Sequence, residues 1–473
     1  MRVFETSVQE LKNDVLRSVA CLTWADGLQT GILDIPQQII PGPEAKMRCC
    51  IYKERAIIAQ RVKVAMGGDK SNPNLVEVLD IACDECPVTE ITVGPACRGC
   101  IATRCVHTCP KDAITIVNHK AQIDHSKCIT CGKCLSACPY GAIEKNQRPC
   151  ERGCKAGAIS MGPDKKAFVD PAKCTSCGAC VYQCPFGAIM DKSYMVDAIQ
   201  MLKSAEKWGY RVYAAVAPSI AGQFAPADVG QVVTGLKLLG FYDVVEVALG
   251  ADMTAREEAG ELAEKGMLAS SCCPAFVEYV EKNFPQQAHL ISQTPSPMVM
   301  AARMVKEKDA NAKVIFIGPC VAKKKEFQLG KTMGAVDCVL TFEELYAMFE
   351  ARNIDVAALE EAELDQASGY GRCFARSGGV TAAVAQALKE QEADFALKPM
   401  PCSGFEACRL AFLKAAKGVG DFNFIEGMAC EGGCVQGPAQ LIRSPRNQGD
   451  VERHAKQAEG RTIADAVRAA RGE

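Results

Sequence analysis

Residues 128–139 read CITCGKCLSACP, and residues 174–185 read CTSCGACVYQCP. In both segments four cysteines are separated by two, two and three residues, and a proline follows the last cysteine. The second half of this pattern, Cys-x3-Cys followed by a short turn and Ala-Ile, occurs four times and begins at Cys105, Cys134, Cys150 and Cys180. Such internal repetition predicts two copies of one small structural unit in tandem.

Cysteine is unusually frequent. The chain has 473 residues and 28 cysteines, of which 16 lie between residues 83 and 184. Disulfides and structural zinc are the simplest explanations, but C-x2-C spacings in a reducing cytosol favour metal, and zinc sites usually include histidine. The two segments have the spacing with which bacterial ferredoxins bind 4Fe–4S clusters: three thiolates of one loop bind one cluster, and the fourth binds its neighbour. We therefore expect tandem ferredoxin-like (α+β) units with 4Fe–4S clusters.

The same crossing rule assigns ligands to each cluster. In the first unit it predicts one set of Cys97, Cys100, Cys105 and Cys138 and another of Cys109, Cys128, Cys131 and Cys134. In the second unit the predicted set is Cys154, Cys174, Cys177 and Cys180. Cys150 and Cys184 then need two partners, and the obvious suppliers are Cys83 and Cys86. Alternatively, Cys83 and Cys86 are plain thiols or half of a zinc site, and only three such clusters form.

Charge and hydropathy exclude several classes of function. The 54 Lys and Arg residues nearly balance the 56 Asp and Glu residues, and no basic block is present, so we expect neither a nucleic-acid nor a membrane partner. The N-terminus lacks the apolar core of a signal peptide, and no uncharged apolar run reaches the length of about 18 residues that suggests a membrane span. A cytoplasmic protein is expected, with a monomer as the simplest state.

We expect four regions. An N-terminal region of unclear fold (1–90) contains a helix near residues 8–20 and the unexplained pair Cys49-Cys50. It is followed by the tandem ferredoxin-like domain (91–195), to which Cys83 and Cys86 are candidate contributors. A third domain (205–443) precedes a polar, helix-prone C-terminal surface tail (444–473).

The third region alternates strands with amphipathic helices. Strands are expected at Tyr210–Ala217, Val244–Ala248 and Lys313–Ile317, and helices at Thr254–Lys265, Ala275–Asn283, Phe342–Ala351 and Val380–Glu390. Strands that alternate with helices favour an α/β architecture with mostly parallel sheets.

Three more cysteine motifs lie in this region: residues 270–276 read SSCCPAF, residues 318–324 read GPCVAKK, and residues 426–434 read EGMACEGGC. In this order they resemble the signature motifs of the catalytic domain of FeFe (iron-only) hydrogenases, over about residues 205–440. Ala275-Phe276 and Gly318 replace the commonest Gly-Trp and Met, so the chain looks like group B of that family, a monomeric type with N-terminal ferredoxin-like clusters.

The resemblance implies two lobes around an H-cluster, at which protons and electrons are interconverted with H2. By resemblance, the ligands of its 4Fe–4S part are Cys273, Cys320, Cys430 and Cys434. One of the last two also bridges to a two-iron centre with CO, cyanide and azadithiolate. Four thiolates on three segments are compatible with a cubane, but the two-iron centre follows from the resemblance alone.

Further residues match the surroundings of that centre. Lys323 matches the lysine that binds a cyanide, Ser219 matches a residue beside the dithiolate, and Met428 and Pro297 match residues that enclose it. The alternatives are a surface lysine and ordinary packing.

A proton relay is also implied. Cys272 matches the thiol that passes protons from the bridging amine, and Glu258, Ser292 and Glu261 match the residues that follow it. The alternative is a solvated acidic helix face. Met298 and Glu431 depart from the usual glutamine and proline of the family.

Met400-Pro401-Cys402 imitates the second motif but lacks the lysines that should follow, so we interpret Cys338, Cys373, Cys402 and Cys408 as core thiols.

The leading hypothesis is a hydrogenase whose clusters exchange electrons with a ferredoxin or similar small redox protein and whose H-cluster is built by hydrogenase maturation proteins. One alternative is a hydrogenase-like H2 sensor or regulator, which typically adds a signalling module. Another is an iron–sulfur electron-transfer or assembly protein without the two-iron centre. The assembly factors are expected to lack counterparts of Cys272 and Lys323.

Overall fold

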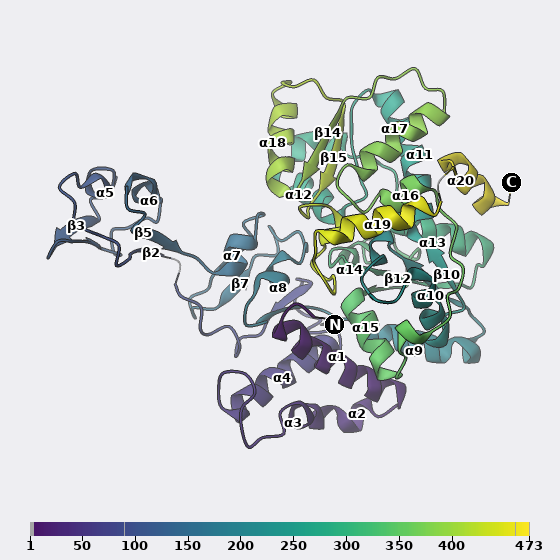
Figure 1. Cartoon of the computed structure of the whole chain (residues 1–473), viewed down its shortest axis with the longest axis horizontal. Helices are drawn as coiled ribbons and strands as arrows, with labels where there is room; N and C mark the ends of the chain where they lie inside the picture. The colour runs from purple at the N-terminus through teal and green to yellow at the C-terminus, as the bar shows by residue number, and fades with distance from the viewer. Residues whose placement is uncertain (1–3, 89, 459, 473) are drawn as a thin grey trace.

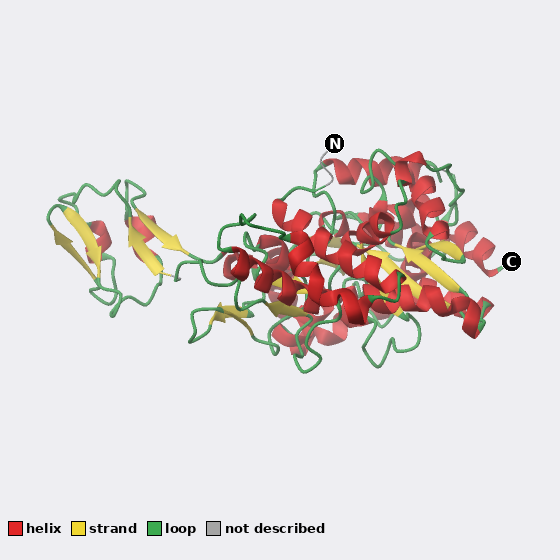
Figure 2. Ribbon diagram, turned by 90° about the horizontal axis from the view of Figure 1, so that it is seen from below, coloured by secondary structure: helices red, strands yellow, loops and turns green. Residues whose placement is uncertain are grey.

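A computed structural model describes residues 4–88, 90–458 and 460–472. Figure 1 shows a large α/β body, a group of helices at the N-terminus and an arm that carries the first cysteine-rich segments. The arm projects from the body in the perpendicular view as well (Figure 2). No helix in the described part of the chain is long and apolar enough to cross a membrane.

The N-terminal region is helical. It contains α1 (Ser7–Trp24), α2 (Leu28–Gly31), α3 (Ile35–Ile39) and α4 (Ile51–Ala65). The Thr6 side chain caps α1 by accepting a hydrogen bond from the backbone N–H of Gln9. Val15 and Val19 are buried on the face of α1 that packs against the body, and they belong to its hydrophobic core. The helix expected at residues 8–20 is confirmed, and it extends to Trp24.

The cysteine-rich segments form two units of the same topology. The outer unit, residues 90–146, consists of β2 (Glu90–Val93), α5 (Arg104–His107), β3 (Ile114–Val117), β4 (Lys120–Ile123), α6 (Lys133–Ala137) and β5 (Ile143–Asn146). The inner unit, residues 76–86 and 149–191, consists of β1 (Val76–Val78), α7 (Pro149–Gly153), β6 (Ile159–Met161), β7 (Ala167–Val169), α8 (Ala179–Gln183) and β8 (Ile189–Asp191). In each unit the first strand pairs antiparallel with the last, and the middle strands form a hairpin.

The units are nested, which corrects the expected tandem order and the boundary at residue 91. The inner unit begins at β1, and the whole outer unit is inserted between Cys86 and Cys150. The insertion is possible because β1 and β8 close the inner unit whatever the length of the loop between them, and loop length costs little free energy.

The body contains two parallel sheets, as the alternation of strands and helices predicted. One has the order β10-β9-β12-β13 and consists of β9 (Val212–Val216), β10 (Asp243–Glu246), β12 (Lys313–Gly318) and β13 (Cys338–Thr341). The other has the order β11-β15-β14 and consists of β11 (Leu268–Ala269), β14 (Pro399–Ser403) and β15 (Phe424–Met428).

Helices surround both sheets (Figure 1). They are α9 (Met195–Trp208), α10 (Val229–Leu238), α11 (Val247–Lys265), α12 (Pro274–Asn283), α13 (Pro297–Lys308), α14 (Lys323–Glu326), α15 (Phe342–Ala351), α16 (Gly369–Cys373), α17 (Gly379–Glu390) and α18 (Phe405–Ala416). Helix α11 is buried along most of its first three turns and packs against α13, α16 and α17. It touches β10 of one sheet and β11 of the other, so it links the two sheets through the centre of the body.

The last 30 residues are not a surface tail. They form α19 (Arg446–Lys456) and α20 (Ile463–Arg471), which pack against α16, α11 and α17. Val451, Ala466 and Val467 are buried in these contacts. The helices are polar overall because only one narrow face of each meets the body.

Candidate active site

Four loops meet between the two sheets, each directly after a parallel strand. They follow β9, β11, β12 and β15, in agreement with the rule that sites in α/β folds lie at the carboxyl ends of strands. The loops surround a cavity of about 80 Å³ with almost entirely apolar walls. The predicted site residues that line it are Ser219, Cys272, Cys273, Pro297, Cys320, Lys323, Met428 and Cys434.

The four predicted cube ligands lie together beside this cavity. Burial, followed by the charge of Cys273, raises the pKa of the Cys320 thiol to about 11. Burial, followed by the charges of Cys320 and Cys273, also raises the pKa of both Cys430 and Cys434. Four buried thiolates would repel one another, so the arrangement fits positively charged iron among them.

Lys323 is buried, which excludes the alternative of a surface lysine. Its Nζ donates to Glu326 Oε2 at 2.6 Å, to Ser296 Oγ at 2.9 Å and to the carbonyl of Cys272 at 3.2 Å. Burial opposes the charge, but the Glu326 carboxylate outweighs burial and raises the Lys323 pKa. A permanent cation therefore lies in an otherwise apolar wall.

The Ser219 hydroxyl is also buried in this wall. Among the described residues its Oγ has no hydrogen-bond partner. A buried hydroxyl without a partner is unfavourable, so the cavity suits a guest with a hydrogen-bonding atom near Ser219 and a negative charge near Lys323. Met428 and Pro297 supply apolar contacts.

Glu258 lies behind Cys272. Its carboxyl group is fully buried on α11. Burial of the Cys272 thiol, followed by the charge of Glu258, raises the pKa of that thiol. Glu258 Oε1 accepts from the backbone N–H of Ser271 at 2.9 Å and lies within hydrogen-bond distance, 3.1 Å, of its Oγ. Burial raises the Glu258 pKa to about 7. A solvated acidic face is therefore excluded for Glu258.

Glu261 lies one turn further along α11 and nearer the surface. Its Oε2 accepts from Ser292 Oγ at 2.5 Å. Burial opposes ionisation of Glu261, but hydrogen bonds from Lys265 and Ser292 outweigh it and lower the pKa. Glu261 therefore stays ionised at neutral pH.

Two members of this network were not predicted from the sequence. Ser271 Oγ donates to the carbonyl of Thr294 at 2.6 Å, and the Thr294 N–H donates to Ser292 Oγ at 3.1 Å. Ser271 and Thr294 thus connect Glu258 to Ser292, and Ser292 is hydrogen-bonded to Glu261. The position of Ser271, directly before Cys272 in the first motif, was the available signal.

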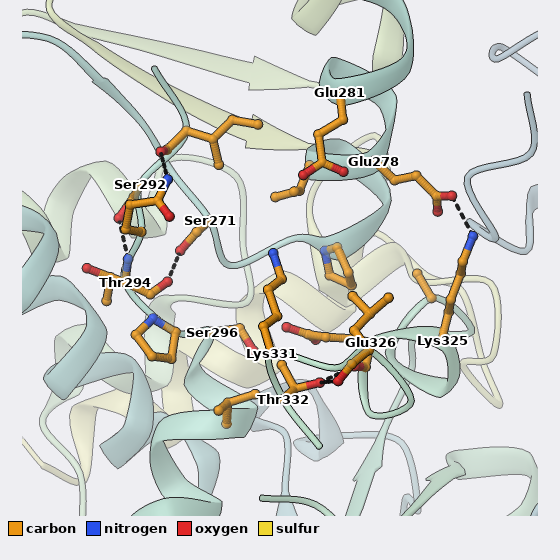
Figure 3. Close-up of a pocket in the computed structure, with 18 of the residues that line it drawn as sticks. Ser271, Glu278, Glu281, Ser292, Thr294, Ser296, Lys325, Glu326, Lys331 and Thr332 are labelled. Carbon is orange, nitrogen blue, oxygen red and sulfur yellow. Dashed lines mark hydrogen bonds and ion pairs between the residues drawn. The ribbon is translucent and has the colours of Figure 1, made fainter. Parts of the chain in front are cut away.

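A larger polar cavity of about 370 Å³ lies outside this network. Figure 3 shows Ser271, Ser292, Thr294 and Ser296 on one side of it. Glu326 lines it too and holds Lys323, which faces the apolar cavity. The hydroxyl network and the Lys323 ion pair therefore form the wall between the two cavities.

The structure brings the 16 cysteines of the two units into four groups of four. Cys97, Cys100, Cys105 and Cys138 line one small cavity of the outer unit, and Cys109, Cys128, Cys131 and Cys134 line another. In the inner unit, burial and then the charges of Cys184, Cys83 and Cys86 raise the pKa of Cys150 to about 12. Burial, followed by the charges of Cys177, Cys174 and Cys154, likewise raises the pKa of Cys180.

These are the predicted sets, with Cys83 and Cys86 in the fourth. Within the described residues, no three His, Cys, Asp or Glu side chains are placed to hold a single metal ion.

Comparisons with known proteins agree with this geometry. Residues 210–438 match the C-terminal domain of the iron-only hydrogenase large subunit, residues 96–142 a 4Fe-4S dicluster domain and residues 167–190 a 4Fe-4S binding domain. The chain is 30% identical over 384 residues to the periplasmic [Fe] hydrogenase large subunit of Nitratidesulfovibrio vulgaris, covering 68% of this chain and 87% of that one. The chain belongs to the iron-only hydrogenase family.

Two other relatives extend the comparison. Iron hydrogenase 1 of Clostridium pasteurianum is 29% identical over 402 residues, which cover 72% of this chain and 69% of the relative. A cytosolic Fe-S cluster assembly factor of Eremothecium gossypii is 27% identical over 169 residues, which cover 32% of this chain and 38% of the relative.

In this family member, the two cysteine groups of the inner unit and the group at the cavity lie one after another. The charge of Cys150 raises the pKa of Cys180, so the two groups of the inner unit are neighbours. The charge of Cys177 raises the pKa of Cys430, so the group that contains Cys177 is next to the group at the cavity. These three groups are thus close enough to interact electrostatically.

The remaining cysteines and the departures from the family pattern are also placed. Cys338, Cys402 and Cys408 are buried as expected, but Cys373 is only partly buried. Met298 lines the apolar cavity, where it adds to the apolar wall. Glu431 is exposed in the turn after Cys430.

Phe276 replaces the usual tryptophan of the first motif. Its ring fills the space where a side chain at position 427 would lie, since a Cβ there would approach the ring to 2.2 Å.

Proposed function

We propose that the chain is an FeFe hydrogenase that catalyses the reversible reaction of two protons and two electrons to H2 at an H-cluster. The observation that carries the proposal is the apolar cavity that brings Ser219, Cys272 and Lys323 beside the group of Cys273, Cys320, Cys430 and Cys434. A protein that held only a cube would need the four ligands but not these three side chains.

The residues fit the H-cluster. The four cysteines would hold its 4Fe–4S part, and the cavity would hold a two-iron centre with CO, cyanide and azadithiolate. Lys323 would bind an anionic cyanide, and the unpartnered Ser219 hydroxyl would meet the dithiolate. When bound, the group supplies an open iron site and a nearby amine base for heterolytic cleavage of H2.

The chain's own residues move the protons. The Cys272 thiol lines the cavity and lies beside Glu258, which can both donate and accept a proton at neutral pH because its pKa is about 7. From Glu258 the Ser271 hydroxyl leads to the polar cavity, and Ser292 connects to Glu261 near the surface. Protons would therefore enter and leave through the polar cavity of Figure 3.

Four accessory 4Fe–4S clusters would carry the electrons, with the outer unit as the point of exchange. Residues 90–146 contain seven Lys and Arg but only four Asp and Glu, although the whole chain has a net charge of −2. Ile101, Ile129 and Tyr140 are exposed on the same unit. A basic surface with exposed apolar side chains suits an acidic ferredoxin, and hydrogenase maturation proteins would insert the two-iron centre.

Infrared spectroscopy of the matured protein tests the proposal. Protein produced with the hydrogenase assembly proteins should show bands of metal-bound CO and cyanide and should evolve H2 from a reduced dye. Full iron loading without these bands would refute the two-iron centre and the hydrogenase activity together.

The similarity to a cluster assembly factor supports a second candidate, an iron–sulfur protein without the two-iron centre. The burial of Lys323 and Cys272 at an apolar cavity favours the hydrogenase, because a cube holder has no use for them. The same spectra separate the two: bands require the hydrogenase, and a cube signal alone supports the second candidate. A hydrogenase-like H2 sensor would show the bands but only slow turnover.

A further inference from the structure

Three arginine side chains are almost completely buried in the described part of the chain: Arg61, Arg148 and Arg372. Arg372 has two carboxylate partners, Glu246 at 2.7 Å and Asp365 at 3.0 Å. Among the described residues, neither Arg61 nor Arg148 has a carboxylate within ion-pair distance, and each has one guanidinium nitrogen without any hydrogen-bond partner. A buried cation without an anion is strongly unfavourable, so both point to a missing negative group.

Arg61 comes from α4 and lies against the loop that follows Cys184. Its Nη2 donates to the carbonyl of Phe186 at 3.2 Å, and its Nη1 contacts Met190 Sδ at 3.8 Å. A Cβ built on Gly187 would lie 2.5 Å from Nη2, so the guanidinium packs directly on this loop. Burial lowers the Arg61 pKa to about 10, with the charge of Cys184 opposing, so the side chain stays cationic at neutral pH.

Arg148 lies beside the same cysteine group but comes from a different segment, the one directly before Cys150. It precedes Cys150 by two residues, and its Nε donates to the carbonyl of Pro87, the residue after Cys86, at 3.4 Å. Burial and the charge of Cys184 raise the pKa of the Cys86 thiol, and the charge of Arg148 opposes this rise. The two unpaired guanidiniums therefore flank one group: Cys83, Cys86, Cys150 and Cys184.

Two lysines near other cysteine groups have carboxylate partners. Lys323 pairs with Glu326, and Lys325 near Cys174 pairs with Glu278. Arg48, which also lies near Cys86, is partly exposed and pairs with Asp84. Among the described residues, the buried cations without a carboxylate partner, Arg61 and Arg148, thus both lie beside the group of Cys83.

We propose that Arg61 and Arg148 are the charge partners of an anionic 4Fe–4S cluster bound by Cys83, Cys86, Cys150 and Cys184, and that they raise its reduction potential. The inference rests on the proposed fourth accessory cluster. Reduction adds one electron and makes the cluster one charge more negative, and fixed cations in a dry surrounding stabilise the reduced form more than the oxidised form. This cluster would then be an electron reservoir one step before the cluster of Cys154, Cys174, Cys177 and Cys180.

A redox titration of the holoenzyme followed by electron paramagnetic resonance tests this. Arg61→Gln should shift one accessory midpoint potential to more negative values, with a tenfold or larger drop in the ratio of reduced to oxidised cluster at fixed potential, about 59 mV for one electron. Arg148→Gln should move the same signal, whereas Arg61→Lys should leave the potential close to the wild-type value because it keeps the charge.

Arg55→Gln is the matched control. Arg55 is on the same helix, and among the described residues its side chain donates to the carbonyls of Ile40 and Pro41, both at 2.8 Å, so its loss should leave every potential unchanged. Unchanged potentials in both Arg61→Gln and Arg148→Gln would overturn the inference, as would an equal shift in Arg61→Lys and Arg61→Gln.

Iron content separates this failure from that of the fourth cluster. Wild-type protein with iron for only three accessory clusters would refute the fourth cluster and the inference with it, but not the active site. Iron for four accessory clusters with unmoved potentials would refute the role of the arginines alone.

Discussion

Cys272 and Cys273 are neighbours in the chain, but they serve different parts of the site. Cys273 joins the four-cysteine group and begins the turn into α12, whereas Cys272 has Glu258 beside it. Because successive side chains in extended backbone point in different directions, one thiol can bind metal while the next remains free to carry a proton.

Replacement of the free thiol should stop proton transfer without removing the metal. We expect Cys272→Ala to keep the infrared bands of CO and cyanide and to lose at least about 100-fold in H2 evolution, a typical effect of losing a general acid or base. Cys338→Ala, which removes another buried thiol that does not line the cavity, is the control. Turnover that survives in Cys272→Ala would remove this residue from the mechanism.

Glu258 should set the pH dependence of turnover. Its pKa of about 7 means that the group is mostly protonated below pH 7 and mostly ionised above it. H2 evolution needs the acid form, so it should decline as the pH rises through about 7, and H2 oxidation should decline as the pH falls through it.

Glu258→Gln keeps the shape of the side chain but cannot titrate. The variant should lose most activity, and its residual pH profile should lack the inflection near 7. An inflection that persists in Glu258→Gln would assign it to another group.

At the scale of elements, the short helix α14 places three consecutive lysines in three surroundings. Lys323 faces the apolar cavity, and Lys325 lines the polar one. Lys324 is fully buried, and its Nζ pairs with Asp191 of β8 at 2.7 Å and with Glu344 of α15 at 2.9 Å. Lys12 of α1 pairs with the same Asp191 at 2.8 Å. This ion cluster joins the N-terminal helices, the inner unit and the body.

Removal of the central cation should weaken this junction. Lys324→Met leaves Glu344 buried without a cation and Asp191 with only Lys12, which typically costs about 3–5 kcal/mol. We expect a clear drop in unfolding temperature by calorimetry and earlier proteolysis between the inner unit and the body. Lys325→Met, which breaks a partly exposed pair with Glu278, should cost less than about 1 kcal/mol. Equal effects of the two substitutions would show that burial of the cluster is not decisive.

Elements with a strong pattern were predictable. The helix expected at residues 342–351 has those bounds in the structure, where Thr341 and Glu344 form a capping box at its start. The strand expected at 244–248 instead ends at Glu246, and α11 begins at Val247. An apolar run does not distinguish a buried strand from the first turn of a buried helix.

At the scale of the whole molecule, the nested units make the outer unit a separable module. The outer unit has only a short connection at the corresponding place, since four residues separate Cys100 from Cys105. In the inner unit, the entire outer unit separates Cys86 from Cys150. The contact between Arg148 and Pro87 shows that the two ends of the insertion lie close together.

Excision of the outer unit tests its role. Replacement of residues 88–147 by a short flexible linker should remove the iron of two 4Fe–4S clusters and leave the CO and cyanide bands intact. H2 evolution from a small reduced dye should persist, and evolution from reduced ferredoxin should fall sharply. Unchanged activity with ferredoxin would place the partner elsewhere, and loss of the bands would show that the outer unit supports the active site.

Cysteine spacing alone predicted the ferredoxin-like units and three of their ligand sets, because cluster ligands on one tight loop require a local spacing, and it left open whether Cys83 and Cys86 complete a fourth set. Three separate motifs also carried the resemblance to iron-only hydrogenases and with it Cys272 and Lys323. Only the tertiary structure decided that the units are nested, that Ser271 links Glu258 to the polar cavity, and that Arg61 and Arg148 flank one cysteine group. These features depend on contacts between segments far apart in the chain, and burial, which controls the charge of Glu258 and the cost of an unpaired arginine, is a property of the folded whole.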